Sequence, residues 1–103
     1  MEFLDFLFGG KQRKLKTYLE KGSVILDVRT QAEWNNGHIE NAIHIPLVDL
    51  PNRTDEIKNL HKTVITCCQS GIRSAKAVKI LNAKGMDAIN GGGWAALNRI
   101  IRS

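Results

Sequence analysis

Short apolar runs alternate with longer amphipathic segments along this chain. Four runs have the length of buried strands: residues 24–28, 42–45, 64–67 and 88–90. Apolar residues recur at helical spacing over residues 11–20, 50–60, 73–84 and 94–101, and a turn with a short helix is predicted over residues 29–36. Strands that alternate with helices are typical of a parallel sheet covered on both faces, so we predict an α/β fold.

The length and composition fit one domain. With 103 residues and 43% hydrophobic content, we assign residues 11–103 to a single domain and residues 1–10 to a short apolar N-terminal segment. No apolar run approaches the roughly 18 residues of a membrane span. The net charge of +5 favours anionic partners. The charge alone does not indicate a nucleic-acid partner, because the sequence has no zinc-finger spacing and no aromatic RNA-binding motif. It also has no phosphate-binding loop, and we expect no metal or cofactor.

The N-terminal segment is amphipathic. Residues 3–8 hold five large apolar side chains, of which Phe3, Leu4, Leu7 and Phe8 recur at helical spacing, and basic residues follow from Lys11 onward. The acidic Glu2 and Asp5 argue against a secretory signal. We expect a turn or two of helix, which either docks on its own domain or makes a peripheral contact with a membrane or a partner. The sequence leaves both open.

The most informative stretch is the end of the third apolar run. Cys68 stands where the apolar residues stop, and four residues separate it from Arg73, near which a helix begins. A loop of this length can direct several backbone N–H groups at the space above the sulfur, with the guanidinium closing the ring. The helix N-terminus and the fixed positive charge favour the thiolate. We therefore predict that Cys68 is a nucleophile with a lowered pKa.

The preceding residue, Cys67, has a different predicted role. In an extended segment Ile65 and Cys67 face one side of the sheet, and Thr66 and Cys68 face the other. Cys67 is predicted to pack in the core, whereas Cys68 lies at the carboxyl edge of the sheet, where open α/β sheets bind ligands. Two adjacent cysteines do not make a disulfide framework, so we expect a reducing compartment and a cytoplasmic location.

Two motifs follow one another along the chain. The first comprises Leu26, Asp27, Val28, Arg29, Glu33, Trp34, Gly37, His38, Ile39, Ala42, Ile45 and Pro46. The second consists of Cys68, Gln69, Ser70, Gly71, Ile72, Arg73 and Ser74, and is followed by Gly92, Gly93 and Trp94. With both motifs in this order and at this separation, about residues 20–101 resemble the rhodanese superfamily of sulfurtransferases, in particular its small single-domain members.

The resemblance implies a rhodanese-like fold and sulfur transfer. Cys68 would take a sulfur atom from a small anionic donor such as thiosulfate, carry it as a persulfide, and pass it to cyanide, a thiol or a protein. Substrate binding would fall to the loop residues Gln69, Ser70, Gly71, Ile72, Arg73 and Ser74. The N–H groups of residues 69–73 would stabilise the negative terminal sulfur, as an oxyanion hole stabilises oxygen.

Other motif residues are expected to support this loop. Asp27, Arg29 and Glu33 are predicted to form a structural charge network, because buried charges need partners. His38 follows a glycine at a turn and is predicted to be a hydrogen-bonded scaffold residue. Arg73 is expected mainly to hold the loop and, to a lesser degree, to attract an anion.

The segment 90–94 is the other stretch expected to shape the site. Its three glycines predict a tight connection after the last strand and permit a close backbone approach to the Cys68 loop. Trp94 either forms a pocket wall or packs in the core, and the sequence does not separate these roles.

Two alternative functions stay open. Counted from Cys67, five residues separate the cysteine from Arg73, which is the pattern of cysteine-dependent phosphatases and would fit phosphatase or arsenate-reductase activity. No nearby loop offers an obvious acid for a leaving group, however. A rhodanese-like fold can also serve as a binding module without catalysis. The sequence identifies neither the physiological sulfur donor nor the acceptor.

Overall fold

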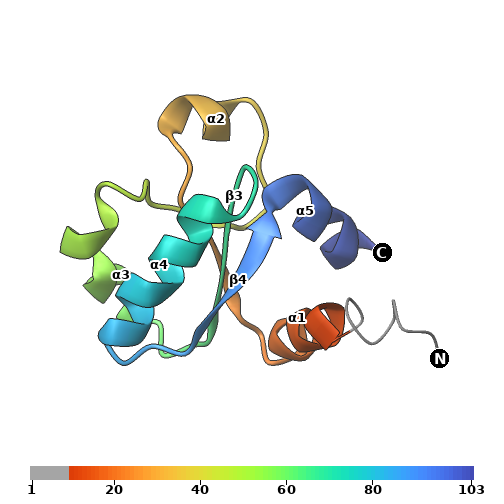
Figure 1. The fold of residues 1–103 in the computed structure, drawn as a ribbon, viewed down its shortest axis with the longest axis horizontal. Helices are drawn as coiled ribbons and strands as arrows, with labels where there is room; N and C mark the ends of the chain where they lie inside the picture. Colours follow the sequence, from red (N-terminus) through yellow and green to blue (C-terminus); the bar gives the residue numbers. More distant parts are fainter. Residues whose placement is uncertain (1–9) are drawn as a thin grey trace.

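The computed structural model describes residues 10–103 of the chain (Figure 1). Its elements are α1 Gly10–Glu20, β1 Val24–Asp27, α2 Gln31–Asn35, β2 Ile43–His44, the 3₁₀ turn η2 Leu50–Asn52, α3 Thr54–Lys58, β3 Val64–Cys68, α4 Ile72–Ala83, β4 Ala88–Gly93 and α5 Trp94–Arg102. The strands form one parallel sheet in the order β2-β1-β3-β4. The predicted α/β fold is confirmed. The helical turn expected over residues 3–8 lies outside the described residues.

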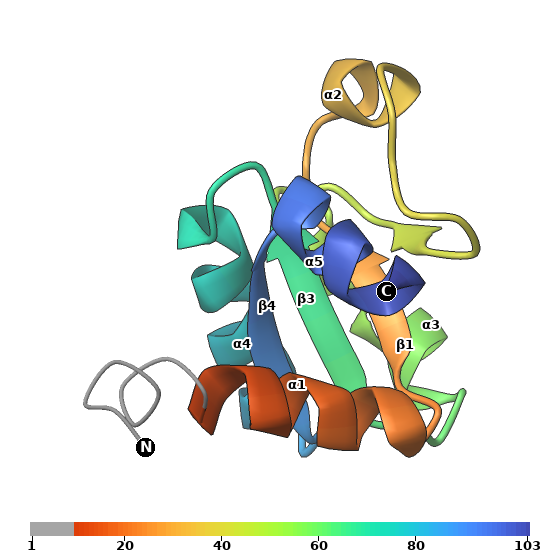
Figure 2. The same ribbon diagram turned by 90° about the vertical axis from the view of Figure 1, so that its right-hand side faces the viewer.

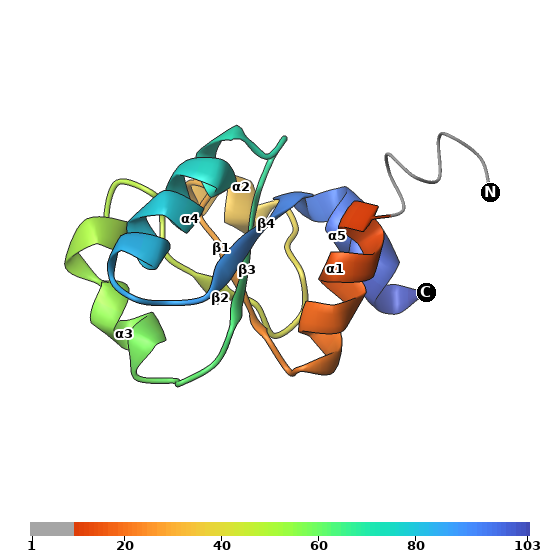
Figure 3. The same ribbon diagram turned by 60° about the horizontal axis from the view of Figure 1, so that its bottom comes forward.

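Helices cover both faces of the sheet (Figure 2, Figure 3). On one face, which we call the α3/α4 side, the core is built from residues such as Leu26, Ile45, Ile57 and Leu81. On the other face, the α1/α5 side, the core includes Leu15, Tyr18, Ile39, Ile65 and Leu97. The inner strands β1 and β3 therefore lie between two apolar layers, which explains why their sequences are almost continuously apolar.

Strand β3 contributes alternate residues to the two layers. All five of its residues are buried. Val64 and Cys68 belong to the α3/α4 core, whereas Ile65 and Cys67 belong to the α1/α5 core. The predicted alternation along this strand is confirmed, and it directs the two neighbouring cysteine side chains to opposite faces of the sheet.

Strand β4 is longer than predicted, because the three glycines continue the strand. A Cβ atom at Gly91 would lie 2.7 Å from Ile65 Cγ2 and 2.8 Å from Thr66 O. Only glycine therefore fits where β4 approaches β3 so closely. A register irregularity between Thr66 and Cys68 accompanies this close approach, and Gly93 pairs with Cys68 at the strand end. The expectation of a tight connection over residues 91–93 was wrong, since tertiary pairing extends the strand.

Other predicted boundaries shift slightly. The helical segment expected over residues 50–60 is divided into η2 and α3, which ends at Lys58. Helix α1 begins at Gly10, helix α4 begins at Ile72, and β3 includes Cys68 as its last residue. Across residues 10–103, none of the helices has the length and apolar character that crossing a membrane requires.

Candidate active site

The sulfur of Cys68 accepts hydrogen bonds from the loop that follows β3. The N–H of Gly71 donates to Cys68 Sγ at 3.0 Å, and the N–H of Ser74 donates at 3.4 Å. The hydroxyl Oγ of Ser74 lies 3.3 Å from the same sulfur. The loop thus surrounds Cys68 at the carboxyl end of the sheet, where a ligand site was expected. Ser74, one residue beyond the predicted 69–73 range, supplies one of these N–H groups.

A glycine allows this loop to turn into helix α4. Gly71 precedes the first helical residue and has φ of +103°, a conformation that side chains disfavour. A Cβ atom at Gly71 would also lie 3.3 Å from Gly92 Cα. The predicted close approach of the glycine segment to the loop is confirmed, since a Cβ at Gly93 would lie 2.8 Å from Gln69 O.

These contacts lower the pKa of Cys68. Burial alone would raise it, because the charged thiolate loses solvation. Hydrogen bonds from the Ser74 hydroxyl and from the N–H groups of Ser74, Gly71 and Ser70 outweigh burial and bring the pKa below its ordinary value. The first residues of α4 also lie at the positive end of its helix dipole. The arrangement favours a thiolate over a thiol.

Cys67 lies in the opposite environment. Its side chain packs with Ile65 and Leu97 on the α1/α5 side and is 0% exposed. Burial, followed by the negative charge of Asp27, raises the pKa of Cys67 to about 12. Both cysteines are free thiols. A cysteine with so high a pKa is almost entirely protonated near neutral pH and is a poor nucleophile.

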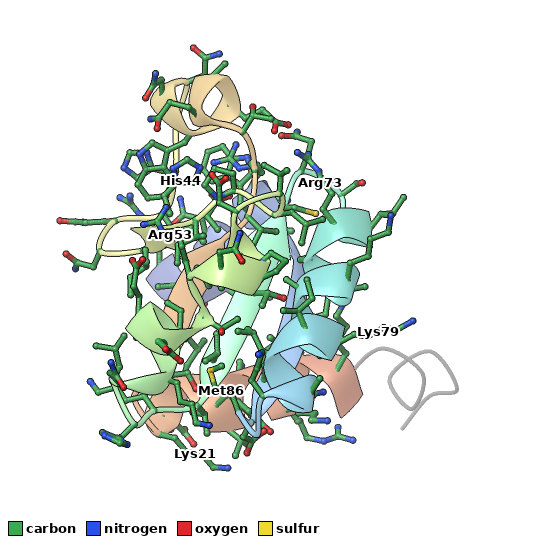
Figure 4. All side chains as sticks on the ribbon, turned by 90° about the vertical axis from the view of Figure 1, so that its left-hand side faces the viewer. Lys21, His44, Arg53, Arg73, Lys79 and Met86 are labelled. Atoms are coloured by element: carbon green, nitrogen blue, oxygen red, sulfur yellow. The ribbon has the colours of Figure 1, made fainter. Side chains whose placement is uncertain are left out.

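Arg73 is held by Glu33 of helix α2. Its Nη1 and Nη2 atoms donate to Glu33 Oε1 and Oε2 at 2.7 and 3.0 Å. The side chains are 33% and 30% exposed, and Figure 4 shows Arg73 at the end of the molecule that carries α2. The sequence analysis assigned Arg73 mainly to holding the loop. In the structure it ties the start of α4 to α2, because a bidentate carboxylate satisfies the planar guanidinium.

The carboxylate of Glu33 is accordingly ionised over a wide pH range. The hydrogen bonds from Arg73, and then the backbone N–H of Thr30, lower the pKa of Glu33 to about 2. Thr30 caps α2 by accepting the Glu33 N–H at 3.2 Å and donating to its carboxylate. The predicted network of Asp27, Arg29 and Glu33 therefore needs correction, because the Glu33 carboxylate pairs with Arg73.

Asp27 and Arg29 form a separate buried ion pair below the site. Arg29 Nη2 donates to Asp27 Oδ2 at 2.7 Å, and the side chains are 2% and 0% exposed. The guanidinium also donates to the carbonyl oxygens of Gly37 and Glu33 and lies over the ring of Trp94 at 4.7 Å. This pair fixes the turn between β1 and α2, so its place in the structure is that of a scaffold.

His38 and Trp34 form part of the same scaffold. The imidazole of His38 stacks on Trp34 with ring centroids 3.5 Å apart, and its Nδ1 donates to Trp34 O at 2.9 Å. His44, which the sequence did not single out, stacks near Trp34 and donates from Nε2 to Arg29 O at 2.7 Å. These contacts brace α2, which in turn holds Arg73.

The remaining predicted residues lie around the loop in different ways. Gln69, Ser70 and Ile72 are exposed, whereas Ser74 is fully buried. A cavity of about 300 Å³ has Arg73 in its wall, with Val28, Thr30, Pro46, Leu47 and Val48. Trp94 is not part of this wall, since it packs in the α1/α5 core and against Arg29. Among residues 10–103, no three His, Cys, Asp or Glu side chains are placed to hold a metal ion.

Sequence reasoning missed the side chain of Asn90. It lies in β4, accepts a hydrogen bond from Ser74 Oγ at 2.7 Å, and donates to Gly71 O at 2.9 Å. Both partners also contact the sulfur of Cys68. The only signal in the sequence was the position of Asn90 directly before the three glycines, and that position indicates a close backbone approach rather than a side-chain contact.

Comparison with known proteins identifies relatives of this chain. A family model described as a rhodanese-like domain matches residues 11–99. Thiosulfate sulfurtransferase 18 from Arabidopsis thaliana is 35% identical over 96 residues, which covers 79% of this chain and 71% of that protein. A crystal structure of a rhodanese-like domain protein from Staphylococcus aureus superposes with a TM-score of 0.70 at 36% identity, covering 84% of this chain and 86% of the other.

A further relative is much longer than this chain. The tRNA sulfurtransferase of Thermoplasma acidophilum is 32% identical over 74 residues, which is 72% of this chain. The match spans only 15% of that protein.

Proposed function

The chain belongs to the rhodanese-like family, and from this premise we propose that it is a sulfurtransferase that carries sulfur as a persulfide on Cys68. One observation carries the proposal. The sulfur of Cys68 accepts N–H hydrogen bonds from Gly71 and Ser74 at 3.0 and 3.4 Å, in a loop that lowers its pKa. These donors suit both a thiolate and the negative sulfur of a persulfide.

Thiosulfate, or a related donor, supplies the sulfur in this proposal. The Cys68 thiolate attacks the outer sulfur of thiosulfate and forms a new S–S bond. The original S–S bond breaks, and sulfite leaves with the bonding electron pair. Because sulfite is a good leaving group, the step needs no general acid. The absence of an acid from the loop sequence is consistent with this chemistry.

The second step returns the enzyme to its starting state. An acceptor such as cyanide or a thiolate attacks the terminal sulfur of the Cys68 persulfide, and the S–S bond breaks with its electrons on Cys68. Cyanide leaves as thiocyanate, and a thiolate acceptor leaves as its own persulfide. The acceptor in the cell is a thiol or a protein, and a reducing compartment such as the cytoplasm keeps both cysteines as thiols.

The position of Cys67 argues against the phosphatase alternative. That reading needs Cys67 as the nucleophile, but this side chain is 0% exposed and its pKa is raised to about 12. Its face of the sheet is covered by α1 and α5, whereas the loop N–H groups are directed at Cys68. We therefore retain a single catalytic proposal.

Intact mass measurement after thiosulfate treatment tests the proposal. We expect one added sulfur atom, which peptide mapping places on Cys68 and cyanide removes. A protein that gains no sulfur would fit a binding module instead. Phosphate release from an aryl phosphate, with Cys67 required, would show that the five-residue spacing is the working one.

The N-terminal segment supports a second, peripheral contact. Residues 3–8 are rich in large apolar side chains, and the exposed basic residues of α1 follow directly: Lys11, Arg13, Lys14 and Lys16. We propose that they attach the protein to anionic membranes. Flotation with anionic vesicles should recover the full chain and not a variant without residues 1–10. Equal flotation of both would contradict this contact, and the sulfur-transfer rate should be nearly the same in both.

A further inference from the structure

The side-chain amide of Asn90 has a fixed orientation. Its Oδ1 accepts the N–H of Gly92 at 2.9 Å, and its Nδ2 donates to the carbonyl of Gly71, also at 2.9 Å. A backbone N–H can only donate and a carbonyl oxygen can only accept, so the amide cannot be reversed without losing both bonds. The acceptor Oδ1 is therefore the atom that faces Ser74.

This orientation assigns the proton of Ser74. Its Oγ lies 2.7 Å from Asn90 Oδ1, and an amide oxygen accepts only, so the serine hydroxyl donates its single proton to Asn90. Toward Cys68 Sγ, 3.3 Å away, Ser74 Oγ then presents a lone pair. In this arrangement the thiol S–H of Cys68 donates to Ser74.

Ionisation of Cys68 changes which atom attracts the proton of the Ser74 hydroxyl. A thiolate has no proton to donate and attracts the Ser74 hydroxyl, which must rotate away from Asn90 to reach it. The thiolate and the Asn90 oxygen thus compete for one proton. Asn90 also holds Gly71, whose N–H donates to the sulfur at 3.0 Å.

We propose that Asn90 is a positioning residue for Cys68, whose amide fixes Gly71 in the loop and competes with the sulfur for the Ser74 proton. The role deepens the proposed sulfur transfer and rests on it for its catalytic consequence. The contacts themselves concern the thiol alone. The Asn90 side chain in β4 thereby contacts both Gly71 and Ser74, the two residues that hydrogen-bond to Cys68 Sγ.

The substitution Asn90→Asp has a definite expected sign. The carboxylate is a stronger acceptor for the Ser74 proton, cannot donate to Gly71 O, and adds a negative charge beside the thiolate. All three changes disfavour the thiolate, so the pKa of Cys68 should rise. We expect alkylation of Cys68 by iodoacetamide to be roughly fivefold or more slower at pH 7, with the rates converging at high pH where the thiol is fully ionised.

The substitution Asn82→Asp is the matched control. Asn82 is exposed near the end of α4, its Oδ1 faces the N–H of Ala88 at 3.4 Å, and it lies on the order of 15 Å along the helix from the loop. It receives the same added charge, and its alkylation profile should match that of the original protein. The charged residues around this end of the sheet are the same in every variant: Arg73, Glu33, Asp27, Arg29 and Lys11 of α1, whose Nζ approaches Gly92. Coincident profiles of the Asn90 and Asn82 variants would overturn the proposal.

A double-mutant cycle keeps the test valid if Asn90→Asp does not fold. Asn90→Ala removes the competitor for the Ser74 proton, and Ser74→Ala removes the proton itself. Removal of Asn90 should therefore raise the alkylation rate several-fold more, relative to the matching protein that keeps Asn90, when Ser74 is present than when it is alanine. Equal ratios in the two backgrounds would overturn the competition.

The readout separates this inference from the proposed function. Alkylation requires only the Cys68 thiolate, whereas the proposed function requires persulfide formation from thiosulfate. An unmodified mass after thiosulfate, together with the expected Asn90 profiles, would reject sulfur transfer and leave the positioning role in place. Persulfide formation with coincident Asn90 and Asn82 profiles would reject only the positioning role.

Discussion

Cys67 and Cys68 are neighbours in one strand, and they differ in almost every property except exposure. Both side chains are nearly inaccessible, at 0% and 1%. The pKa of Cys67 is raised to about 12, whereas that of Cys68 is lowered. The alternation of β3 places Cys67 against the α1/α5 core and Cys68 against the loop. Burial raises the pKa of both thiols, but at Cys68 the hydrogen bonds from Ser74, Gly71 and Ser70 outweigh it.

Hydrogen-bond donors distinguish the two positions. Cys68 stands at the point where β3 ends and the chain turns through Gly71 into α4, so N–H groups that would otherwise lack partners converge on its sulfur. Cys67 lies one residue earlier, where its backbone groups belong to the sheet, as in the bond from Val28 N–H to Cys67 O. A shift of one residue along a strand thus separates a thiol packed in the core from a thiol that accepts N–H hydrogen bonds.

The same contrast extends to the two ion pairs near the cysteines. Asp27 and Arg29 form a pair that is almost completely buried, and Asp27 raises the pKa of Cys67. Glu33 and Arg73 form a pair that is about one third exposed, at the start of α4. The buried pair belongs to the scaffold of the sheet edge, and the exposed pair links α2 to the helix that carries the loop.

Exchange of each cysteine is the strongest test of the contrast. Cys68→Ser should abolish sulfur transfer from thiosulfate to cyanide, because a serine hydroxyl is not ionised near neutral pH. Cys67→Ala should retain most of the turnover and lose about 1–2 kcal/mol of stability through the small core vacancy. Steady-state rates and circular dichroism of both variants measure this. If turnover survived in Cys68→Ser but not in Cys67→Ala, Cys67 would be the catalytic residue and Cys68 the structural one.

Removal of the buried charge should have the next largest effect. Asp27→Asn leaves the guanidinium of Arg29 buried without a carboxylate, and we expect a loss of about 3 kcal/mol in the free energy of unfolding. Urea denaturation checks this value. A loss below about 1 kcal/mol, the range of exposed pairs, would mean that the Asp27 pair is not part of the scaffold in the way its burial indicates.

The donors around Cys68 can be disturbed at Gly71. Gly71→Ala forces a side chain into φ of +103° and against Gly92, at a cost of about 1–2 kcal/mol, and should raise the pKa of Cys68 by moving the N–H donor. Gly85→Ala is the matched control, because Gly85 has φ of +84° and an added Cβ atom there would meet nothing within 4 Å. It should lose similar stability and leave the pH dependence of Cys68 alkylation unchanged. Equal alkylation profiles of the two variants would show that the Gly71 donor is unimportant.

Sequence patterns within single strands and loops were sufficient to predict the different positions of Cys67 and Cys68. The apolar runs located β1 and β3, and the alternation of side chains placed Ile65 and Cys67 on the face opposite Cys68. The change from apolar to polar residues after Cys68 located the loop. These signals were sufficient because a buried parallel strand and a glycine before a helix leave clear marks in a short window of sequence.

Contacts between distant segments were not predictable in the same way. Glu33 and Arg73 are 40 residues apart, and both were singled out without being paired with each other. Asn90 reaches Gly71 and Ser74 only because the glycines after it let β4 approach β3. A tertiary approach of this kind depends on three segments at once, and no periodicity along the chain records it.

The exposed pair should have the smallest effect and a distinct pH dependence. The pKa of Glu33 is about 2 in the folded protein, below the ordinary value of about 4.3 in an unfolded chain. Its ionised form is therefore favoured by folding. The pair stabilises the protein at pH values above the unfolded pKa, and this stabilisation is lost as the pH falls from about 4 toward 2.

Glu33→Gln should consequently cost about 1 kcal/mol or less at pH 7, because both side chains are about one third exposed and water screens the pair. The difference in unfolding free energy from the original protein should stay constant down to about pH 5 and shrink below it, since protonated glutamic acid and glutamine have similar capacities to pair with Arg73. Urea titrations at several pH values measure the difference. A difference that grew as the pH fell would show that folding does not lower the pKa of Glu33. Contacts other than the pair with Arg73 would then hold α2 to α4.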